Sequence, residues 1–204
     1  MNNSPIHIVN RFRGYLPVII DVETGGFNAK TDALLELAAT TITMMPDGTL
    51  EPDQTYHYHI IPFKNANLEP SALEFNGIDP FHPFRMAMEE EKALTDLFGH
   101  IRKALKASGC KRAVLVGHNP WFDLSFIHAA ITRHHIKHDP FHRFTTFDTA
   151  ALSALLYGET VLAKAVAAAG LPFDTDKAHS ALYDAHITAE LFCKIVNSVP
   201  FFAK

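Results

Sequence analysis

Short apolar runs alternate with amphipathic segments along the chain, which predicts strands that are followed by helices. Apolar and β-branched runs between turn residues indicate strands at residues 16–22, 34–45, 55–62, 113–117 and 144–148. A Pro-Asp-Gly turn at residues 46–48 favours an antiparallel pairing of the second and third strands. Apolar residues at helical spacing indicate helices near residues 94–105, 121–134, 150–156, 161–169 and 181–196.

This order of elements predicts an α/β fold with a mixed central β-sheet flanked by helices. A chain of 204 residues is expected to form one domain, residues 1–204, with its core at about 16–197. The proline-rich stretch at residues 65–85 is expected to be a loop, and it is too short to separate domains.

Composition and charge narrow the class of protein. Hydrophobic residues make up 48% of the chain, which indicates a globular protein rather than a disordered one. The formal net charge is −4, so any nucleic-acid binding has to come from local basic patches. Two cysteines, Cys110 and Cys193, are too few for a disulfide scaffold or a structural cysteine–zinc site.

No targeting signal is visible in the sequence. Residues 1–5 carry no basic charge, and no apolar run approaches the roughly 18 residues that span a bilayer. We therefore expect a cytoplasmic protein.

Two carboxylates stand side by side at the end of the first expected strand. Side chains alternate across a strand, so Asp21 and Glu23 share one face. They repel each other unless a cation lies between them. The alternative is that the strand ends at the surface, where both acids are solvated.

Two further acids lie on the apolar stripes of helices. With Asn119 and Ser180 as N-caps, Asp123 and Asp184 each fall at the fourth helical position. The helix dipole favours an anion there by only about 0.3–1 kcal/mol, whereas burial of an unpaired carboxylate costs several kcal/mol. Either acid alone could be salt-bridged, or could lie just beyond the buried stripe.

Taken together, the four acids predict one oxygen-lined metal site. Oxygen ligands of this number suit Mg²⁺ or Mn²⁺ better than zinc. Two such ions about 4 Å apart are typical of phosphodiester hydrolysis. His179 precedes the last helix, and a histidine on a loop beside metal ions is a natural general base near neutral pH. As one of 13 histidines, it could equally be an ordinary exposed side chain.

The order and spacing of these residues resemble the DEDDh superfamily of 3′→5′ exonucleases, and within it the ribonuclease T family. The resemblance rests on Asp21-x-Glu23, His118-Asn119-x₃-Asp123 and His179-x₄-Asp184, and on the segments at residues 12–14, 26–36, 75–80, 146–152 and 178–184. It covers nearly the whole chain, from about residue 11 to residue 199.

The resemblance implies a ribonuclease-H-like fold and a metal-dependent 3′→5′ exoribonuclease. Such an enzyme trims the single-stranded 3′ ends of structured RNAs, in tRNA end turnover and in the 3′ maturation of stable RNAs such as rRNA precursors, and also acts on single-stranded DNA. Enzymes of this family act as homodimers in the cytoplasm. By similarity, two Mg²⁺ ions are held by Asp21, Glu23, Asp123 and Asp184, with His179 as the base.

Aromatic and basic residues are the candidates for substrate contact. By similarity, the phenylalanines that stack on the terminal bases are Phe27, Phe75, Phe122 and Phe144, although core packing is the ordinary role of this residue type. Ser71 stands where the family can place a glutamate. An uninterrupted basic cluster is expected to hold phosphates, and by similarity it serves the active site of the other protomer; its residues are Arg102, Lys103, Lys106, Lys111 and Arg112, with Arg11 and Arg13 beside them. A solvated helix face is the alternative.

Two histidine patterns carry less weight. The pair His134 and His138 and the pair His57 and His59 each fit zinc spacing, but neither has a third ligand at a convincing position. No Walker loop or GxGxxG motif indicates a nucleotide cofactor.

Two alternative functions remain open from sequence. One is a proofreading exodeoxyribonuclease subunit, which the short segment after the last helix disfavours. The other is a non-catalytic nucleic-acid-binding module, which is expected to have lost at least one of the four acids.

Overall fold

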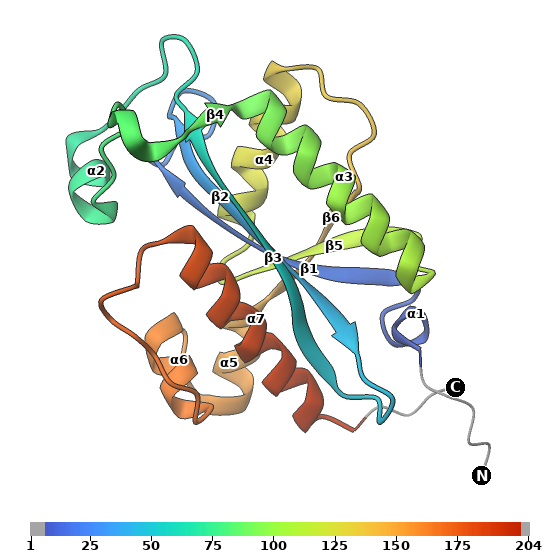
Figure 1. Ribbon diagram of the computed structural model, residues 1–204. Helices are drawn as coiled ribbons and strands as arrows, with labels where there is room; N and C mark the ends of the chain where they lie inside the picture. Colours follow the sequence, from blue (N-terminus) through green and yellow to red (C-terminus); the bar gives the residue numbers. More distant parts are fainter. Residues whose placement is uncertain (1–6, 201–204) are drawn as a thin grey trace.

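A six-stranded mixed sheet forms the centre of the computed structural model, which describes residues 7–200 (Figure 1). The strand order is β4-β3-β2-β1-β5-β6. The strands are β1 (Tyr15–Thr24), β2 (Leu34–Met44), β3 (Leu50–Ile61), β4 (Met88–Glu89), β5 (Arg112–Gly117) and β6 (Phe141–Asp148). β1 pairs antiparallel with β2, and β2 with β3, whereas the β1–β5, β5–β6 and β3–β4 pairs are parallel. The expected α/β class with a mixed sheet is confirmed.

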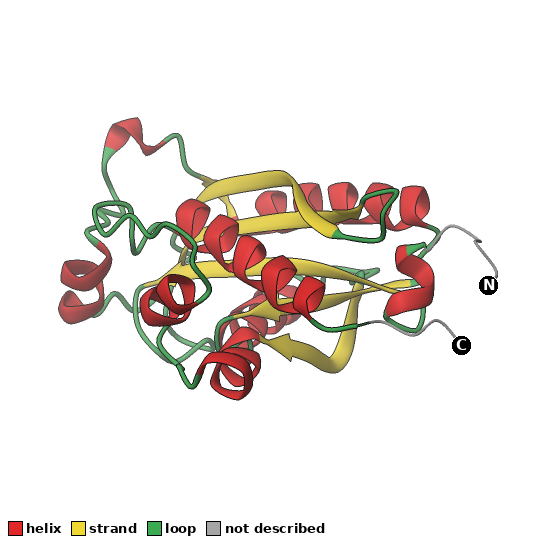
Figure 2. Ribbon diagram, turned by 90° about the horizontal axis from the view of Figure 1, so that it is seen from below, coloured by secondary structure: helices red, strands yellow, loops and turns green. Residues whose placement is uncertain are grey.

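Helices cover both faces of the sheet (Figures 1 and 2). α3 and α4 lie on one face, and α7 lies on the other with α5 and α6 beside it. The helices are α1 (Ile8–Arg11), α2 (Pro70–Asn76), α3 (Glu90–Ser108), α4 (Trp121–Arg133), α5 (Thr149–Tyr157), α6 (Leu162–Ala168) and α7 (Ala181–Ser198), and a 3₁₀ turn covers Pro83–Arg85.

Burial on both faces explains the composition of β1. Val18, Ile19 and Ile20 are each at most 1% exposed, so consecutive side chains enter the two layers in turn. The apolar stripe predicted for α3 is buried as expected, including Leu97 and Phe98. Small residues such as Ala185 and Ala189 let α7 pack closely on its face of the sheet.

Two local predictions differ from the structure. Asn119 is not the N-cap of α4, because it lies in the left-handed region (φ 66°) and Pro120 occupies the cap; Asp123 is therefore at the third helical position. Ser180 is the N-cap of α7, as predicted, and Asp184 is at the fourth helical position, although the Ser180 side chain makes no capping hydrogen bond. The stretch expected to be a loop contains α2, which starts at Pro70 and ends at a left-handed Gly77.

Within residues 7–200, no single helix is long and apolar enough to cross a membrane. The bent pair Thr149–Tyr157 and Leu162–Ala168 passes that test of length and composition together. Residues 1–5, where the sequence shows no targeting signal, lie outside the described part of the chain.

Candidate active site

Asp21 and Glu23 lie near the carboxyl end of β1, in the middle of the sheet. They share one face of the strand, as the alternation of side chains predicts. β5 pairs with β1 only as far as Ile19, so both acids lie just beyond the last parallel pairing. The C-terminal edge of parallel strands in an α/β sheet is a common position for a ligand site.

Asp184 comes from the first turn of α7 and joins these two acids. Ligand atoms of Asp21, Glu23 and Asp184 all lie within 4.8 Å of one another. Asp184 Oδ2 accepts a hydrogen bond from the backbone N–H of His179 at 3.0 Å. Its Oδ1 is buried and has no hydrogen-bond partner among the described residues. A buried, unpartnered carboxylate oxygen that lies beside other acids is suited to binding a cation.

Asp123 approaches from the first turn of α4 but is held differently. Its Oδ1 accepts a hydrogen bond from the backbone N–H of Val22 at 3.0 Å, which fixes the carboxylate against β1. Val22 is the residue between Asp21 and Glu23. It is 5% exposed and close enough to raise the pKa of Asp21. The structure therefore brings all four predicted acids together. The carboxylates of Asp21, Glu23 and Asp184 lie within 4.8 Å of one another, and Asp123 lies beside them.

Desolvation raises the pKa values of all four acids, and repulsion by neighbouring acids raises those of Asp21 and Glu23 further. The pKa of Glu23 is raised to about 8, chiefly by loss of solvation and to a smaller extent by the charge of Asp184. Burial likewise raises the pKa of Asp123 to about 8. The pKa of Asp21 is raised well above its usual value by desolvation and then by its acidic neighbours. Burial also raises the pKa of Asp184, although the His179 N–H opposes the shift.

This donor set fits divalent metal ions of the kind the sequence predicts. All the candidate ligands are carboxylate oxygens, the hard ligands that Mg²⁺ and Mn²⁺ prefer. A bound cation would relieve the repulsion that raises these pKa values. Asp21, Glu23 and Asp184 could hold such an ion directly, and Asp123 is placed to complete the group.

His179 lies on the loop just before α7, with its side chain exposed. Its backbone is in the left-handed region (φ 65°), a conformation that a non-glycine residue adopts only where its surroundings hold it. The His179 N–H bond to Asp184 is one such constraint. The His179 ring lies 4.2 Å from the Phe75 ring, centroid to centroid, so the imidazole is positioned between the acids and an aromatic surface.

A pocket lined by aromatic side chains opens directly beside the acids. Its volume is about 370 Å³, and Glu23 forms part of its wall. Three of the four predicted stacking residues line it: Phe27, Phe75 and Phe122. Phe27 and Phe75 are 84% and 67% exposed, so their rings are accessible to a ligand in the pocket. Ser71 also lines the pocket, as does Asn76, whose side chain donates to the Thr24 carbonyl oxygen.

Phe144, Lys111 and Arg112 lie beside the start of β1, at the end opposite the acids. Phe144 packs edge-on against His142, which in turn contacts Tyr15 at the start of β1. Arg112 pairs with Tyr15 across the sheet, and the Lys111 N–H donates to the Gly14 carbonyl oxygen. Tyr15 and Asp21 are six residue steps apart along the strand, a span of about 20 Å at the usual rise of a strand. The structure thus separates these predicted substrate contacts from the acids of the same chain.

Some members of the basic cluster have structural partners. Arg11 donates to the Val196 carbonyl oxygen at the end of α7, at 2.7 Å. Arg102 and Arg112 donate to the carbonyl oxygens of His138 and Asp139, respectively. Lys103 is turned toward a groove that also contains Asp96 and His100, and Lys106 is exposed on the last turn of α3.

Two polar residues near the site have roles that the sequence did not reveal. His118, part of the second motif, connects β5 to α5 and to the loop before α6 through Thr149 Oγ1 and the Thr160 carbonyl oxygen. Glu36 on β2 is 7% exposed and lies directly opposite Glu23, where its charge contributes to the raised pKa of Asp21 and Glu23. The available signal for Glu36 was a lone acid inside the apolar run of β2.

Known proteins match both the sequence and the fold. The family model described as exonuclease, RNase_T, matches residues 18–192. Ribonuclease T from Yersinia enterocolitica is 61% identical over 187 residues, which cover 92% of this chain and 87% of that protein.

Solved structures share the fold at low sequence identity. The nuclease domain of 3′hExo, a DEDDh family member bound to rAMP, superposes with a TM-score of 0.72 at 18% identity and covers 95% of each chain. E. coli exonuclease I in complex with a dT13 oligonucleotide gives a TM-score of 0.68 at 16% identity, over 90% of this chain and 41% of that one. These structures confirm the expected ribonuclease-H-like fold of the DEDDh exonucleases, and the chain spans about two fifths of exonuclease I. The extent of the family match and the identity to ribonuclease T establish that the chain belongs to the ribonuclease T family of exonucleases and is a 3′→5′ exoribonuclease.

Proposed function

We propose that this enzyme trims short single-stranded 3′ ends of structured RNAs, such as tRNAs and the precursors of stable RNAs including rRNA, and that it also degrades single-stranded DNA. It acts in the cytoplasm as a homodimer, with two Mg²⁺ ions per active site. Mn²⁺ fits the same oxygen ligands. The proposal rests above all on one observation, the aromatic pocket that shares Glu23 with the acid cluster.

The pocket favours single-stranded ends over duplexes. An aromatic ring stacks on a base only after that base has left its neighbours, so Phe27, Phe75 and Phe122 would accept unpaired terminal nucleotides. Stacking tolerates any base and does not read the 2′-hydroxyl, which supports activity on DNA as well as RNA. Trimming would stop where a duplex stem prevents the next base from unstacking. A structured RNA with a short tail is the substrate that these limits fit.

The catalytic roles follow from the positions of the residues. Metal ions held by the four acids would supply activation of a water molecule and neutralisation of the charge that develops on the phosphate. Asp21, Glu23, Asp123 and Asp184 provide the negative pocket that holds them, and the Val22 and His179 N–H groups fix two of those carboxylates in place. His179, exposed and adjacent to Phe75, would take the proton from the attacking water.

The separation of the basic cluster from the acids supports the proposed dimer. Lys111 and Arg112 lie beside the start of β1, about 20 Å along the strand from Asp21, which places them beyond the last nucleotides in that site. In a homodimer, the surface beside the start of β1 would face the active site of the partner. This surface includes Arg13, Lys111, Arg112 and Phe144. The phosphates upstream of the cleaved nucleotide would then be held across the interface.

The charge cluster makes metal-free stability fall with pH. Each acid has a higher pKa in the folded protein than its unfolded value near 4, so folding favours the protonated form and stability falls as pH rises from about 4 toward 8. We expect the melting temperature of chelator-treated protein to fall between pH 5 and pH 8. Asp21→Asn should abolish cleavage, and it should make the melting temperature fall less between pH 5 and pH 8. Saturating Mg²⁺ should likewise reduce the fall in melting temperature of the parent protein. The exposed Glu74→Gln is the matched control; an equal fall in Asp21→Asn would contradict the predicted repulsion.

Replacement of the base should reduce rate rather than binding. We expect His179→Ala to lower the single-turnover rate by about 10²–10⁴-fold, the usual contribution of a general base, with little change in RNA affinity. The pH dependence of the rate below pH 7 should also flatten. A variant whose rate rose with pH as steeply as the parent's would assign the proton to another group.

The pocket is tested by two exposed phenylalanines, one inside it and one outside it. Loss of a base–aromatic stack costs about 1–3 kcal/mol, so Phe27→Ala should raise KM for an RNA with a single-stranded 3′ tail about tenfold or more. Phe81→Ala removes a ring that is 76% exposed but does not line the pocket, and it should leave KM unchanged. The measurement should compare tRNA-like RNA with single-stranded DNA of the same length. Equal KM values for the two variants would remove the basis of the stacking assignment, and a strong preference for DNA would favour the proofreading alternative.

A mixed dimer distinguishes the two possible partners of the basic patch. One chain carries Arg102→Ala, Lys106→Ala and Arg112→Ala together, and the other carries only Asp21→Asn. If the patch serves the partner's site, one working site remains, with about half of parental activity at low RNA concentration. If it serves its own site, activity should fall to about half that of the triple variant. The salt dependence of RNA binding should also weaken in the triple variant, by roughly 0.7 in slope for each lost single-strand phosphate contact.

A further inference from the structure

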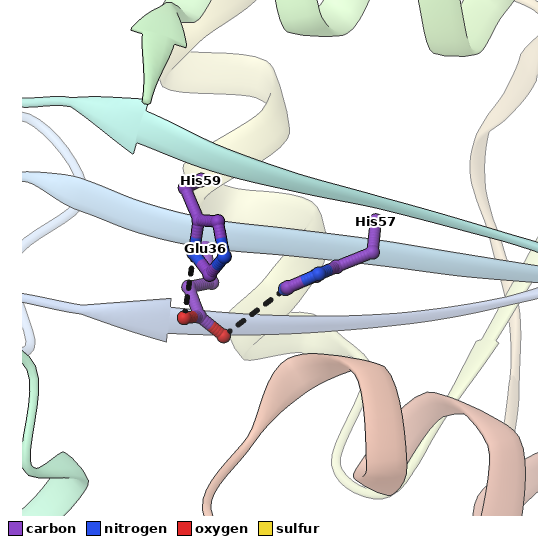
Figure 3. Close-up of side chains that lie close together, drawn as sticks. All are labelled: Glu36, His57 and His59. Carbon is purple, nitrogen blue, oxygen red and sulfur yellow. Dashed lines mark hydrogen bonds and ion pairs between the residues drawn. The ribbon is translucent and has the colours of Figure 1, made fainter. Parts of the chain in front are cut away.

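The histidine pair on β3 acquires a third ligand in the folded protein. His57 and His59 point toward the face of the sheet that carries α7, while Tyr58 between them points to the other face and donates to Asp96 of α3. Glu36 lies on the neighbouring strand between the two imidazoles (Figure 3). Ligand atoms of Glu36, His57 and His59 all lie within 4.8 Å of one another. We propose that these three residues form a second metal site, which binds a transition-metal ion of the zinc class.

Strand register produces this arrangement. Glu36 lies directly opposite His59 in the β2–β3 ladder, and Ala38 lies opposite His57. Because the Ala38 side chain is a single methyl group, it leaves room for the His57 ring to reach along the strand to Glu36. His57 Nε2 lies 3.3 Å from Glu36 Oε2, and His59 Nδ1 lies 2.9 Å from Glu36 Oε1. Each carboxylate oxygen thus faces one imidazole nitrogen.

The Nδ1 atom of His59 makes no hydrogen bond within residues 7–200 although it is buried. His59 Nδ1 is buried, and despite its short contact with Glu36 it has no partner with hydrogen-bond geometry among the described residues. A buried ring nitrogen that faces a carboxylate without alignment to it is placed to bind an ion between them. The side chains of His57 and His59 are 20% and 35% exposed, so water can reach the site and fill a remaining coordination position.

The ligand types select the kind of metal. Two imidazole nitrogens and one carboxylate oxygen match the His₂Glu set that binds zinc with an open fourth position. Mg²⁺, in contrast, prefers oxygen ligands, which the cluster of Asp21, Glu23 and Asp184 offers in full. Arg85 interacts electrostatically with Glu36, but its guanidinium donates to the carbonyl oxygens of Leu35 and Pro80.

The proposed site is separate from the acid cluster but adjacent to it. Glu23, Glu36 and His59 lie opposite one another on three neighbouring strands, so Glu36 stands between the two groups. No residue is shared between the two sets of candidate ligands. The ordinary alternative is a metal-free network in which a carboxylate is paired with two imidazoles, and a binding experiment distinguishes the two.

Calorimetric titration with Zn²⁺ tests the site directly. The protein should carry Asp21→Asn to weaken the acid cluster, and excess Mg²⁺ should occupy what remains of it. We expect one Zn²⁺ ion per chain. His57→Ala or His59→Ala should weaken binding at least about tenfold, because even residues that only orient a metal ligand are worth 10–100-fold. His186→Ala is the matched control, since His186 also pairs with a carboxylate, that of Glu190, but has no third candidate ligand beside it among residues 7–200. Equal Zn²⁺ affinity in all of these variants would overturn the proposal.

Nuclear magnetic resonance of the unsubstituted protein gives a second test that does not depend on the folding of any variant. In Mg²⁺-saturated protein, Zn²⁺ should shift the ring ¹⁵N signals of His57 and His59 and leave those of His186 unchanged. Unaltered ring signals of His57 and His59 at saturating Zn²⁺ would show that the cluster is only an ion-paired network.

Discussion

Repulsion among carboxylates at one end of β1 is the constraint on which the site depends. Four acids from one strand and two helices meet where solvent is restricted. Burial raises the pKa of each acid, and the charges of the neighbouring acids raise those of Asp21 and Glu23 further. Without a cation this arrangement opposes folding at neutral pH. The surrounding core therefore has to hold the acids in place, and the apolar residues of β1 do so by packing into both helical layers. Binding of divalent ions relieves the repulsion between the carboxylates, and this gain in free energy adds to the affinity for the ions.

The mixed sheet explains how distant parts of the chain reach the same place. β1 is the central strand, bordered by an antiparallel neighbour on one side and a parallel one on the other. The parallel connection to β5 leads into α4 at the carboxyl end of β1, which carries Asp123 to Val22. The antiparallel side provides a surface on which α7 lies, so its first turn delivers Asp184 to the same end.

Much of this was readable in the sequence because burial leaves periodic patterns. The strands and the long helices were predicted by apolar spacing, and Asp123 and Asp184 were conspicuous as acids on apolar stripes. The cap of α4 was mispredicted because Asn119 resembles an N-cap, yet it adopts a left-handed conformation and its N–H bonds to Asp148. α2 was missed because a seven-residue helix buries no residue and so leaves no stripe, although Pro70 and Gly77 mark its ends. The contact of Glu36 with His57 and His59 depends on strand register, which local patterns do not encode.

The register of the first three strands restricts how this region can change during evolution. Glu23, Glu36 and His59 form one row across the sheet, and Asp21, Ala38 and His57 form the next. Insertion or deletion of a single residue inside β1 or β2 would turn every later side chain in that strand to the opposite face, and both rows would be lost at once. Substitutions can alter the rows one residue at a time, whereas length changes have to fall in the turns. Homologues should therefore vary in length at the Asp47–Gly48 turn and keep a constant number of residues between Tyr15 and Glu23.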